Sequence, residues 1–505
     1  MTAVTPTSDS ASRYRIEPTV MQALRSPRLL TREVLAGLVV ALALIPEAIA
    51  FSIIAGVDPR VGLFSSFIMA VAIAFLGGRP AMITAATGAI ALVIAPVARE
   101  HGMDYFIATV LLGGLIQIVL ALLGVAKLMR FIPRSVMVGF VNALAILIFT
   151  SQFPQLIGVP WLVYPLVAVG LLVMYLMPLI TKVIPAPLVA IVLLTAAVVV
   201  FAWNVPNVGD QGELPQSLPE LFIPNVPLTF ETLQIIAPFA LAMAVVGLLE
   251  SLMTAKLVDD ITDTHSRKTR EALGQGAANV LSGAFGGMGG CAMIGQTMIN
   301  VKASGARTRI STFLAGVFLL VLVLALGDVV AIIPMAALVA VMILVSIATF
   351  DWHSIRWGTL KRMPKSETAV MLITVIATVW THNLAVGVIL GVITAMIMFA
   401  RRVAHFVSVT RTIDDDASTA RYAVNGELFF ASSNDLTTQF EYADDPDTVV
   451  IDMSRSHVWD ASTVAALDAI VTKYERHGKS VTIEGLNDTA AAFHDRLTGN
   501  LGNGH

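Results

Sequence analysis

Long apolar stretches recur through the first 400 residues of the chain, and short polar connections separate them. A helix needs about 20 apolar residues to cross a hydrocarbon layer of about 30 Å, at a rise of about 1.5 Å per residue. The pattern predicts a polytopic α-helical membrane protein with about fourteen transmembrane segments. We place these segments at residues 31–56, 60–78, 83–98, 103–124, 132–152, 162–181, 186–204, 231–258, 268–286, 292–305, 308–327, 330–349, 366–382 and 383–400.

The basic residues predict the orientation of these segments. Lys and Arg gather in the connections after the fourth, eighth and twelfth segments, whereas the long connection at residues 204–229 has none. The positive-inside rule then places both termini in the cytoplasm and requires an even number of segments. Residues 1–26 lack the pattern of a cleaved signal peptide, so we expect them to form a cytoplasmic N-terminal tail.

Two of the predicted segments are too short to cross a membrane. Residues 83–98 and 292–305 would reach only about 24 Å and about 20 Å as helices. Each follows a glycine cluster and begins with small or polar residues, so we interpret each as an extended segment followed by a half-helix. They are third and tenth in order, which is the same place in two seven-span halves and is typical of an inverted-repeat transporter.

Two half-helices in these positions would point their N-termini at a shared space. Free N–H groups and the positive ends of helix dipoles favour an anion there. The other interpretation is that the glycines only allow close packing of helices. Arg79 and Lys302 lie near the mouths of the two short segments, where they would either attract anions or extend to the cytoplasmic surface.

Glu47 and Glu250 are the two acids that we place deep within segments, each on the first segment of its half. A charge at that depth costs at least about 2.5 kcal/mol, so such an acid is a functional candidate. Burial favours the protonated form of a carboxyl group, which would let either acid take up and release a proton during transport. Glu47 follows Pro46, and its alternative role is to bond backbone N–H groups freed by the proline.

The composition after Arg401-Arg402 changes to that of a soluble domain. Residues 421–430 predict a strand that turns at Asn425-Gly426, and further strands are expected at 448–452 and 481–484. Asp460 is expected to begin a helix, as a capping residue in preference to a site of phosphate chemistry. The tail is therefore predicted to be a small α/β domain.

The overall composition agrees with a membrane protein. Apolar residues make up 56% of the chain and charged residues 13%, against about 25% charged residues in ordinary soluble domains. The single cysteine, Cys291, excludes an internal disulfide, and we interpret it as a small core residue. We expect no cofactor, no metal and no nucleic-acid partner, and we do not expect an enzyme.

These residues together resemble the SulP (sulfate permease) family of anion transporters. The resemblance lies in Ile45-Pro46-Glu47-Ala48 with the glycines around it, in Gly247-Leu248-Leu249-Glu250-Ser251-Leu252, and in the run from Gly286 to Gln296. The tail resembles the STAS domain that usually closes these proteins. The resemblance implies fourteen spans in two inverted seven-span repeats forming core and gate domains, an anion site between the third and tenth spans, and a homodimer.

The resemblance also assigns residues. It points to Ala86, Thr87 and Gly88 on one half-helix, and it implies substrate-binding roles on the other half-helix for Gly295, Gln296 and Thr297. Three departures from the family pattern stand out in this chain: Glu47 replaces a common Gln, Ala86 replaces a common Pro, and Ala461 replaces a serine that soluble STAS relatives phosphorylate.

The domains expected are residues 27–402 for transport, with repeats at about 31–204 and about 231–400, and residues 410–500 for a cytoplasmic STAS domain. We predict a secondary active transporter of sulfate, bicarbonate or a dicarboxylate such as fumarate in the cell membrane, coupled to protons through Glu250 and Glu47. Sodium-coupled bicarbonate symport and a membrane-tethered signalling scaffold are the alternatives.

Overall fold

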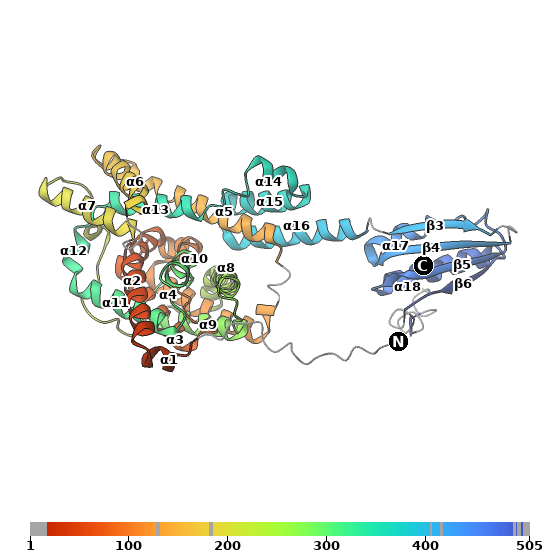
Figure 1. The fold of residues 1–505 in the computed structure, drawn as a ribbon, viewed down its shortest axis with the longest axis horizontal. Coiled ribbons are helices and arrows are strands. Elements are labelled where there is room, and N and C mark those ends of the chain that lie inside the picture. Colours follow the sequence, from red (N-terminus) through yellow and green to blue (C-terminus); the bar gives the residue numbers. More distant parts are fainter. Residues whose placement is uncertain are drawn as a thin grey trace. The chain divides into compact units, whose positions relative to one another are not determined.

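The chain is described by a computed structural model that covers residues 18–127, 132–180, 185–404, 407–414, 418–487, 491 and 496–497. The part of the predicted N-terminal tail before residue 18 lies outside the described residues. The chain divides into two compact units, residues 1–392 and residues 393–505. Figure 1 shows the order of the elements along the chain.

The first half of the larger unit is almost entirely helical. Its elements are α1 (Val20–Arg25), α2 (Pro27–Ala55), α3 (Pro59–Leu76), β1 (Thr84–Ala85), α4 (Gly88–Leu122), α5 (Arg134–Thr150), η2 (Phe153–Leu156), α6 (Val163–Ile180), α7 (Ala186–Val200) and η3 (Val208–Gln211). Proline in the first turn begins both α2 and α3, where its missing N–H has no intrahelical partner to lose.

The second half repeats this order of elements. It contains α8 (Phe230–Thr262), α9 (Lys268–Ala284), β2 (Cys291–Ala292), α10 (Ile294–Met298), the π-helical turn η4 (Ile299–Ala303), α11 (Arg309–Ala325), α12 (Gly327–Ala331), α13 (Met335–Thr349), α14 (Trp357–Arg362), α15 (Lys365–Thr381) and α16 (Leu384–Ala404). The short helices α1, α12 and α14 were not predicted from the sequence.

Gly102 breaks α4 into two helices. Its φ of 81° and ψ of −176° lie outside the helical region and are readily adopted by glycine. The two parts of α4 therefore correspond to the predicted third and fourth spans. Among the described residues, seven helices are long and apolar enough to cross a membrane by length and composition. The number fourteen stays a prediction.

The packing of the helices is related between the two halves. α2 packs against α11, and its counterpart α8 packs against α4; α3 also contacts α11, as α9 contacts α4. β1 and β2 pair antiparallel, with Thr84 opposite Ala292 and Ala85 opposite Cys291. Each of these contacts joins an element of one half to an element of the other half. Exchanging the two halves turns each contact into its counterpart, as expected for structural repeats.

The remaining helices of the larger unit form a second group. α5 packs against α13 and α15, and α6 packs against α7 and α13. These helices come from the same places in the two halves, in agreement with the predicted division into a core and a gate domain. The candidate site is lined by residues of both groups of helices.

The smaller unit contains a four-stranded sheet in the order β3-β4-β5-β6. Its elements are β3 (Ser408–Ile413), β4 (Thr419–Leu428), α17 (Phe430–Leu436), β5 (Thr448–Val458), α18 (Ala461–Arg476) and β6 (Ser480–Glu484). β3 runs antiparallel to β4, and the other pairs are parallel. Asp460 caps α18 by accepting a hydrogen bond of 3.0 Å from the Thr463 N–H, as predicted.

The predicted turn at Asn425-Gly426 is wrong. β4 continues through both residues, and its register against β5 shifts between Ala423 and Asn425. Gly426 takes a φ of 116°, so the glycine allows an irregular backbone conformation inside the strand and does not form a hairpin turn. Asn-Gly favours two-residue hairpins in general, and the parallel partner β5 overrides this local preference here.

Candidate functional site

The two short segments form the centre of the candidate site. β1 and β2 lie side by side through their antiparallel pairing, and each leads directly into a helix. α4 begins at Gly88 with Thr87 as its cap, and α10 begins at Ile294 with Met293 as its cap. The first N–H groups of both helices have no carbonyl partner within their own helix. The predicted sequence of extended segment and half-helix is therefore present in both halves.

A cavity of about 90 Å³ lies where these helices begin. Polar and small residues on its wall are Glu47, Thr87, Gly88, Ala89, Glu250, Gly295, Gln296 and Thr349. α5 and α13 complete the wall with mainly apolar side chains, including Phe140 and Val345. Since one water needs only about 10–15 Å³ by this measure, the cavity holds several waters or a small anion.

The two predicted acids lie on this one wall, although they are far apart in sequence. Glu47 is half-buried on α2, and the side-chain amide of Gln296 hydrogen-bonds its carboxylate. The other amide atom, Gln296 Oε1, is buried without a hydrogen-bond partner among the described residues. A buried acceptor without a partner is costly. Gln296 Oε1 is therefore available to accept a hydrogen bond from a donor in the cavity.

Glu250 belongs to a chain of three side chains. Its Oε2 accepts a hydrogen bond of 2.9 Å from Cys291 Sγ, which also lies 3.1 Å from Thr87 Oγ1. Glu250 and Thr87 are 6% and 2% exposed, so neither is freely solvated in this arrangement. Cys291 therefore connects an acid of the second half with the cap of the half-helix in the first half. Sequence reasoning treated Cys291 as core filling, although its place directly before a half-helix was visible.

Two of the predicted binding residues lie beside the cavity. The Ala86 N–H donates to Ser66 Oγ at 3.2 Å, and Ala86 does not line the cavity. Thr297 Oγ1 accepts a hydrogen bond of 3.0 Å from the Ile83 N–H, which fixes α10 to the segment before β1. Their contacts are those of residues that position the half-helices, whereas the other four predicted residues face the cavity.

A second cavity of about 540 Å³ lies further along α2. Its lining includes Ala50 and residues of α4 and α5. Phe51, which follows Ala50 in the sequence, lines the smaller cavity. Arg99 and His382 also line it, and Arg99 is exposed while it donates to the Ile54 carbonyl at 3.0 Å. The lining of this larger cavity is mainly apolar, and Arg99 is a positively charged residue in it.

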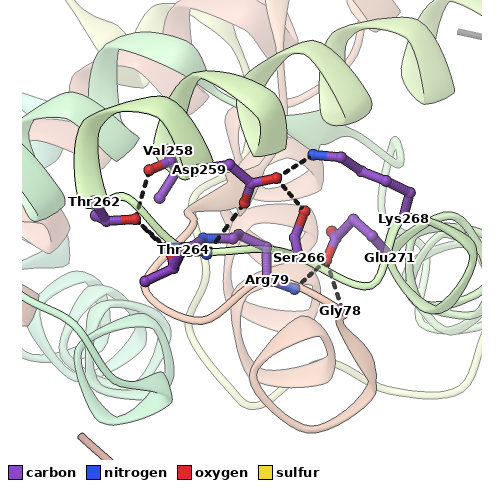
Figure 2. A network of polar contacts seen from close by, with 9 residues as sticks. All are labelled: Gly78, Arg79, Val258, Asp259, Thr262, Thr264, Ser266, Lys268 and Glu271. Atoms are coloured by element: carbon purple, nitrogen blue, oxygen red, sulfur yellow. Dashed lines mark hydrogen bonds and ion pairs between the residues drawn. The ribbon is translucent and has the colours of Figure 1, made fainter. Parts of the chain in front are cut away.

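Arg79 is buried in an ion pair rather than extended to the surface. It is 3% exposed and donates to Asp259 Oδ1 at 3.1 Å, while Lys268 Nζ lies 2.7 Å from Asp259 Oδ2. Figure 2 shows Asp259 between the two cations, with Ser266 as a further donor. The network fastens the segment before β1 to the end of α8, which sequence reasoning did not anticipate. Lys302 is exposed.

Two further buried acids were also missed. Glu271 accepts from the N–H groups of Gly78 and Arg79 at 2.7 and 2.9 Å, as Figure 2 shows. Glu33 accepts from the N–H groups of Arg307 and Thr308, and so satisfies the beginning of α11. Both acids serve backbone groups that would otherwise be unpaired, a role that spacing along the sequence does not reveal.

Both units of the chain match known families. The sulfate permease family matches residues 30–170 and 159–374, and the STAS domain matches residues 410–497. The chain is 51% identical over 462 residues to the putative sulfate transporter YbaR of Bacillus subtilis, covering 92% of this chain and 96% of that protein.

Two solved structures extend the comparison. The transmembrane domain of a cyanobacterium bicarbonate transporter, BicA, is 26% identical with a TM-score of 0.63, covering 72% of this chain and 98% of that chain. The murine Solute Carrier 26 family member A9 anion transporter, in the inward-facing state, has a TM-score of 0.79 at 16% identity, covering 96% of this chain and 88% of that chain. The second likeness concerns the fold alone.

Proposed function

Because this chain belongs to the sulfate permease family, a family of membrane transporters rather than enzymes, we propose that it is a secondary active transporter of small anions. Its relatives bear the names of sulfate and bicarbonate transporters, which supports a small oxyanion as the substrate. A dicarboxylate such as fumarate is the further substrate that we propose to test. Alternating access is proposed as the mode of transport, which the repeated order of elements in the two halves supports. Both termini and the STAS domain are proposed to be cytoplasmic, and the protein is proposed to be a homodimer of the cell membrane.

The anion binds between the half-helices of the third and tenth spans. The observation that carries this proposal is the single cavity on which the beginnings of α4 and α10 converge. Backbone N–H groups at Gly88 and Gly295, with the side chains of Thr87 and Gln296, supply donors to the anion. Ala86, through its backbone N–H, and Thr297, through its hydroxyl, hold the two segments in place.

Transport is coupled to protons through Glu250 and Glu47. Both carboxyl groups share the cavity with the anion, so an ionised acid and the anion repel each other. Protonation on one side of the membrane therefore promotes anion binding, and release of the anion on the other side promotes loss of the proton. This reciprocal dependence is what symport requires.

Uptake of labelled sulfate, bicarbonate and fumarate into proteoliposomes under imposed proton and sodium gradients tests the proposal. An inwardly directed proton gradient is expected to drive accumulation of at least one anion without sodium. Accumulation that needs sodium and ignores the proton gradient would select sodium-coupled symport instead. No accumulation of any of the three anions under either gradient would contradict the proposed function.

The role of the tail is tested by deleting residues after Thr410. Transport by the truncated chain is expected to persist, because the candidate site lies within residues 1–392. Complete loss of transport, with the truncated protein still monodisperse in detergent, would favour the STAS unit as the active part and the alternative of a signalling scaffold.

A further inference from the structure

Two carboxyl groups and no cation line the small cavity among the described residues. Glu47 lies on its wall from α2 and Glu250 from α8, and the remaining lining side chains are uncharged. An anion site usually gains affinity from Arg or Lys, so the absence of either from this wall needs a compensating feature. The following inference rests on the proposed function and concerns how many protons the site must bind.

Charged and titratable groups on the neighbouring elements are engaged elsewhere. Cys291 of β2 is the titratable group that contacts Glu250, and it acts as a donor. Several charged groups on helices packed against α2 and α8 bond other partners: Arg99 of α4 bonds to Ile54 O, Glu271 of α9 to the N–H groups of Gly78 and Arg79, Arg309 of α11 to Gly77 O, and Lys268 of α9 to Asp259. None of these cations is on the wall beside either acid.

The helix ends supply too little positive charge to offset all the negative groups. Each helix N-terminus is equivalent to about half an elementary charge, so two supply about one. A dianion beside two ionised carboxylates would leave about three uncompensated negative charges in a site largely removed from water, a costly state. With both acids protonated, only about one remains. Binding of a dianion therefore favours protonation of both acids.

Each acid is also bonded to a donor that the anion needs. Ionised Glu47 accepts from the Gln296 amide. Protonated Glu47 instead donates to Gln296 Oε1, now without a partner, and this turns the amide N–H groups toward the cavity. Ionised Glu250 accepts from Cys291. Protonated Glu250 can donate to Cys291 Sγ, whose own S–H then turns to Thr87 Oγ1 and frees the threonine O–H for the anion.

We propose that the site alternates between two ionised carboxylates and one bound dianion, so that Glu47 and Glu250 together carry two protons with each divalent oxyanion or dicarboxylate. The protons bind to one carboxyl oxygen of each acid on the side of uptake and leave from the same atoms on the other side. The formal charge of the site is the same in the loaded and the empty states. Transport of a dianion is therefore electroneutral.

Uptake into liposomes that contain the full chain tests this stoichiometry. Labelled sulfate, fumarate and bicarbonate are followed while potassium and valinomycin set the membrane potential. The initial rate for a dianion is expected to be the same at inside-positive and inside-negative potentials. At zero potential, the accumulation ratio is expected to change about 100-fold per unit of pH difference, because each proton contributes about tenfold.

Glu47→Gln removes one of the two protons. Its accumulation ratio is expected to change about tenfold per unit of pH difference, and an inside-negative potential should slow uptake, since one net negative charge now moves inward. Glu231→Gln changes an exposed acid in the first turn of the same helix as Glu250, and it should behave as the unmodified chain.

The outcomes separate the inference from the proposed function. Two results in the unmodified chain would overturn the two-proton inference: an accumulation ratio that changes only tenfold per unit of pH difference, or dianion uptake that depends on the membrane potential. Either result would leave proton-coupled transport itself unaffected. Uptake of bicarbonate alone overturns the divalent substrate class. Unchanged stoichiometry in Glu47→Gln removes that residue from the proposal. Absence of proton-driven uptake of all three anions overturns the proposed coupling itself. The measurement on the unmodified chain decides even where the variant fails to fold.

Discussion

Cys291 Sγ donates a hydrogen bond of 2.9 Å to Glu250 Oε2, and the thiol thereby joins the proposed coupling acid to the half-helix of the opposite repeat. The thiol also lies 3.1 Å from Thr87 Oγ1. A small buried cysteine thereby links the acid that we propose to bind protons with a hydroxyl that lines the cavity.

Cys291→Ala removes this link, whereas Cys291→Ser keeps a donor and an acceptor at the same place. The alanine variant is expected to lose about tenfold in proton-driven uptake, since a hydrogen bond to a charged group contributes about 1.5–3 kcal/mol. The serine variant should stay within about threefold of the unmodified chain. Equal uptake by both variants would show that Cys291 only fills space. Initial rates of uptake at matched protein content provide the measurement.

The glycines at the two half-helix starts are expected to differ in what they tolerate. A methyl group on Gly88 would lie 2.9 Å from Phe51 Cε1 and 3.1 Å from Ile148 Cδ1, so Gly88→Ala should destabilise the fold by about 1–3 kcal/mol. A methyl group on Gly295 meets no atom within 4 Å. Gly295→Ala should therefore keep the stability of the protein but raise the KM for the anion about tenfold.

Thermal unfolding and uptake kinetics, measured on both glycine variants, separate these effects. Loss of stability in Gly295→Ala without a change in KM would contradict the position of Gly295 on an anion-binding wall. An unchanged melting temperature in Gly88→Ala would contradict the close packing of the α4 start against α2 and α5.

Much of this site was predictable because its features are local in sequence. The glycine clusters, the shortness of two segments and the acids Glu47 and Glu250 are all visible in the sequence alone. The pairing of Thr84 with Ala292 is not, because it joins segments about 200 residues apart whose contact depends on the whole bundle. For the same reason, the sequence did not show that Arg79 pairs with Asp259.

The STAS unit is held together by a buried carboxylate. Asp445 accepts hydrogen bonds from Tyr422 at 2.6 Å, from Tyr474 at 2.5 Å and from Arg411 Nε at 2.7 Å. Asp445→Ala leaves these three donors without their partner and should destabilise the unit by about 3 kcal/mol. Asp444→Ala, at an exposed position, is the matched control.

Hydrogen exchange of the full chain, resolved by peptide, measures this effect. Protection of β4 and β5 should fall in the Asp445 variant, while peptides from α2 and α8 keep their protection. Unchanged exchange in β4 and β5 would contradict the assignment of Asp445 as the central contact of the unit.

The tyrosines of this unit give it a dependence on high pH. Burial raises the pKa of Tyr442 to about 12, and burial together with the hydrogen bond to Asp445 raises the pKa of Tyr474. A tyrosine in the unfolded chain ionises near pH 10, so above about pH 10 the folded unit binds more protons than the unfolded chain. Its stability is therefore complete below that pH and falls as the pH rises.

Tyrosinate absorbance of the full chain and of Tyr474→Phe tests this assignment. Both proteins should give the same absorbance change up to about pH 11, because Tyr474 is not expected to ionise while the unit is folded. A smaller change in the variant near pH 10 would place the pKa of Tyr474 at its ordinary value.

The central claim is that Glu250 binds the proton that drives anion uptake. The most direct measurement compares sulfate and fumarate uptake by the unmodified chain, by Glu250→Gln and by the control Glu231→Gln in proteoliposomes under an inward proton gradient. We predict that the accumulation ratio in Glu250→Gln falls from about 100-fold to about tenfold per unit of pH difference, while the control keeps the dependence of the unmodified chain. Undiminished accumulation in Glu250→Gln would contradict the account.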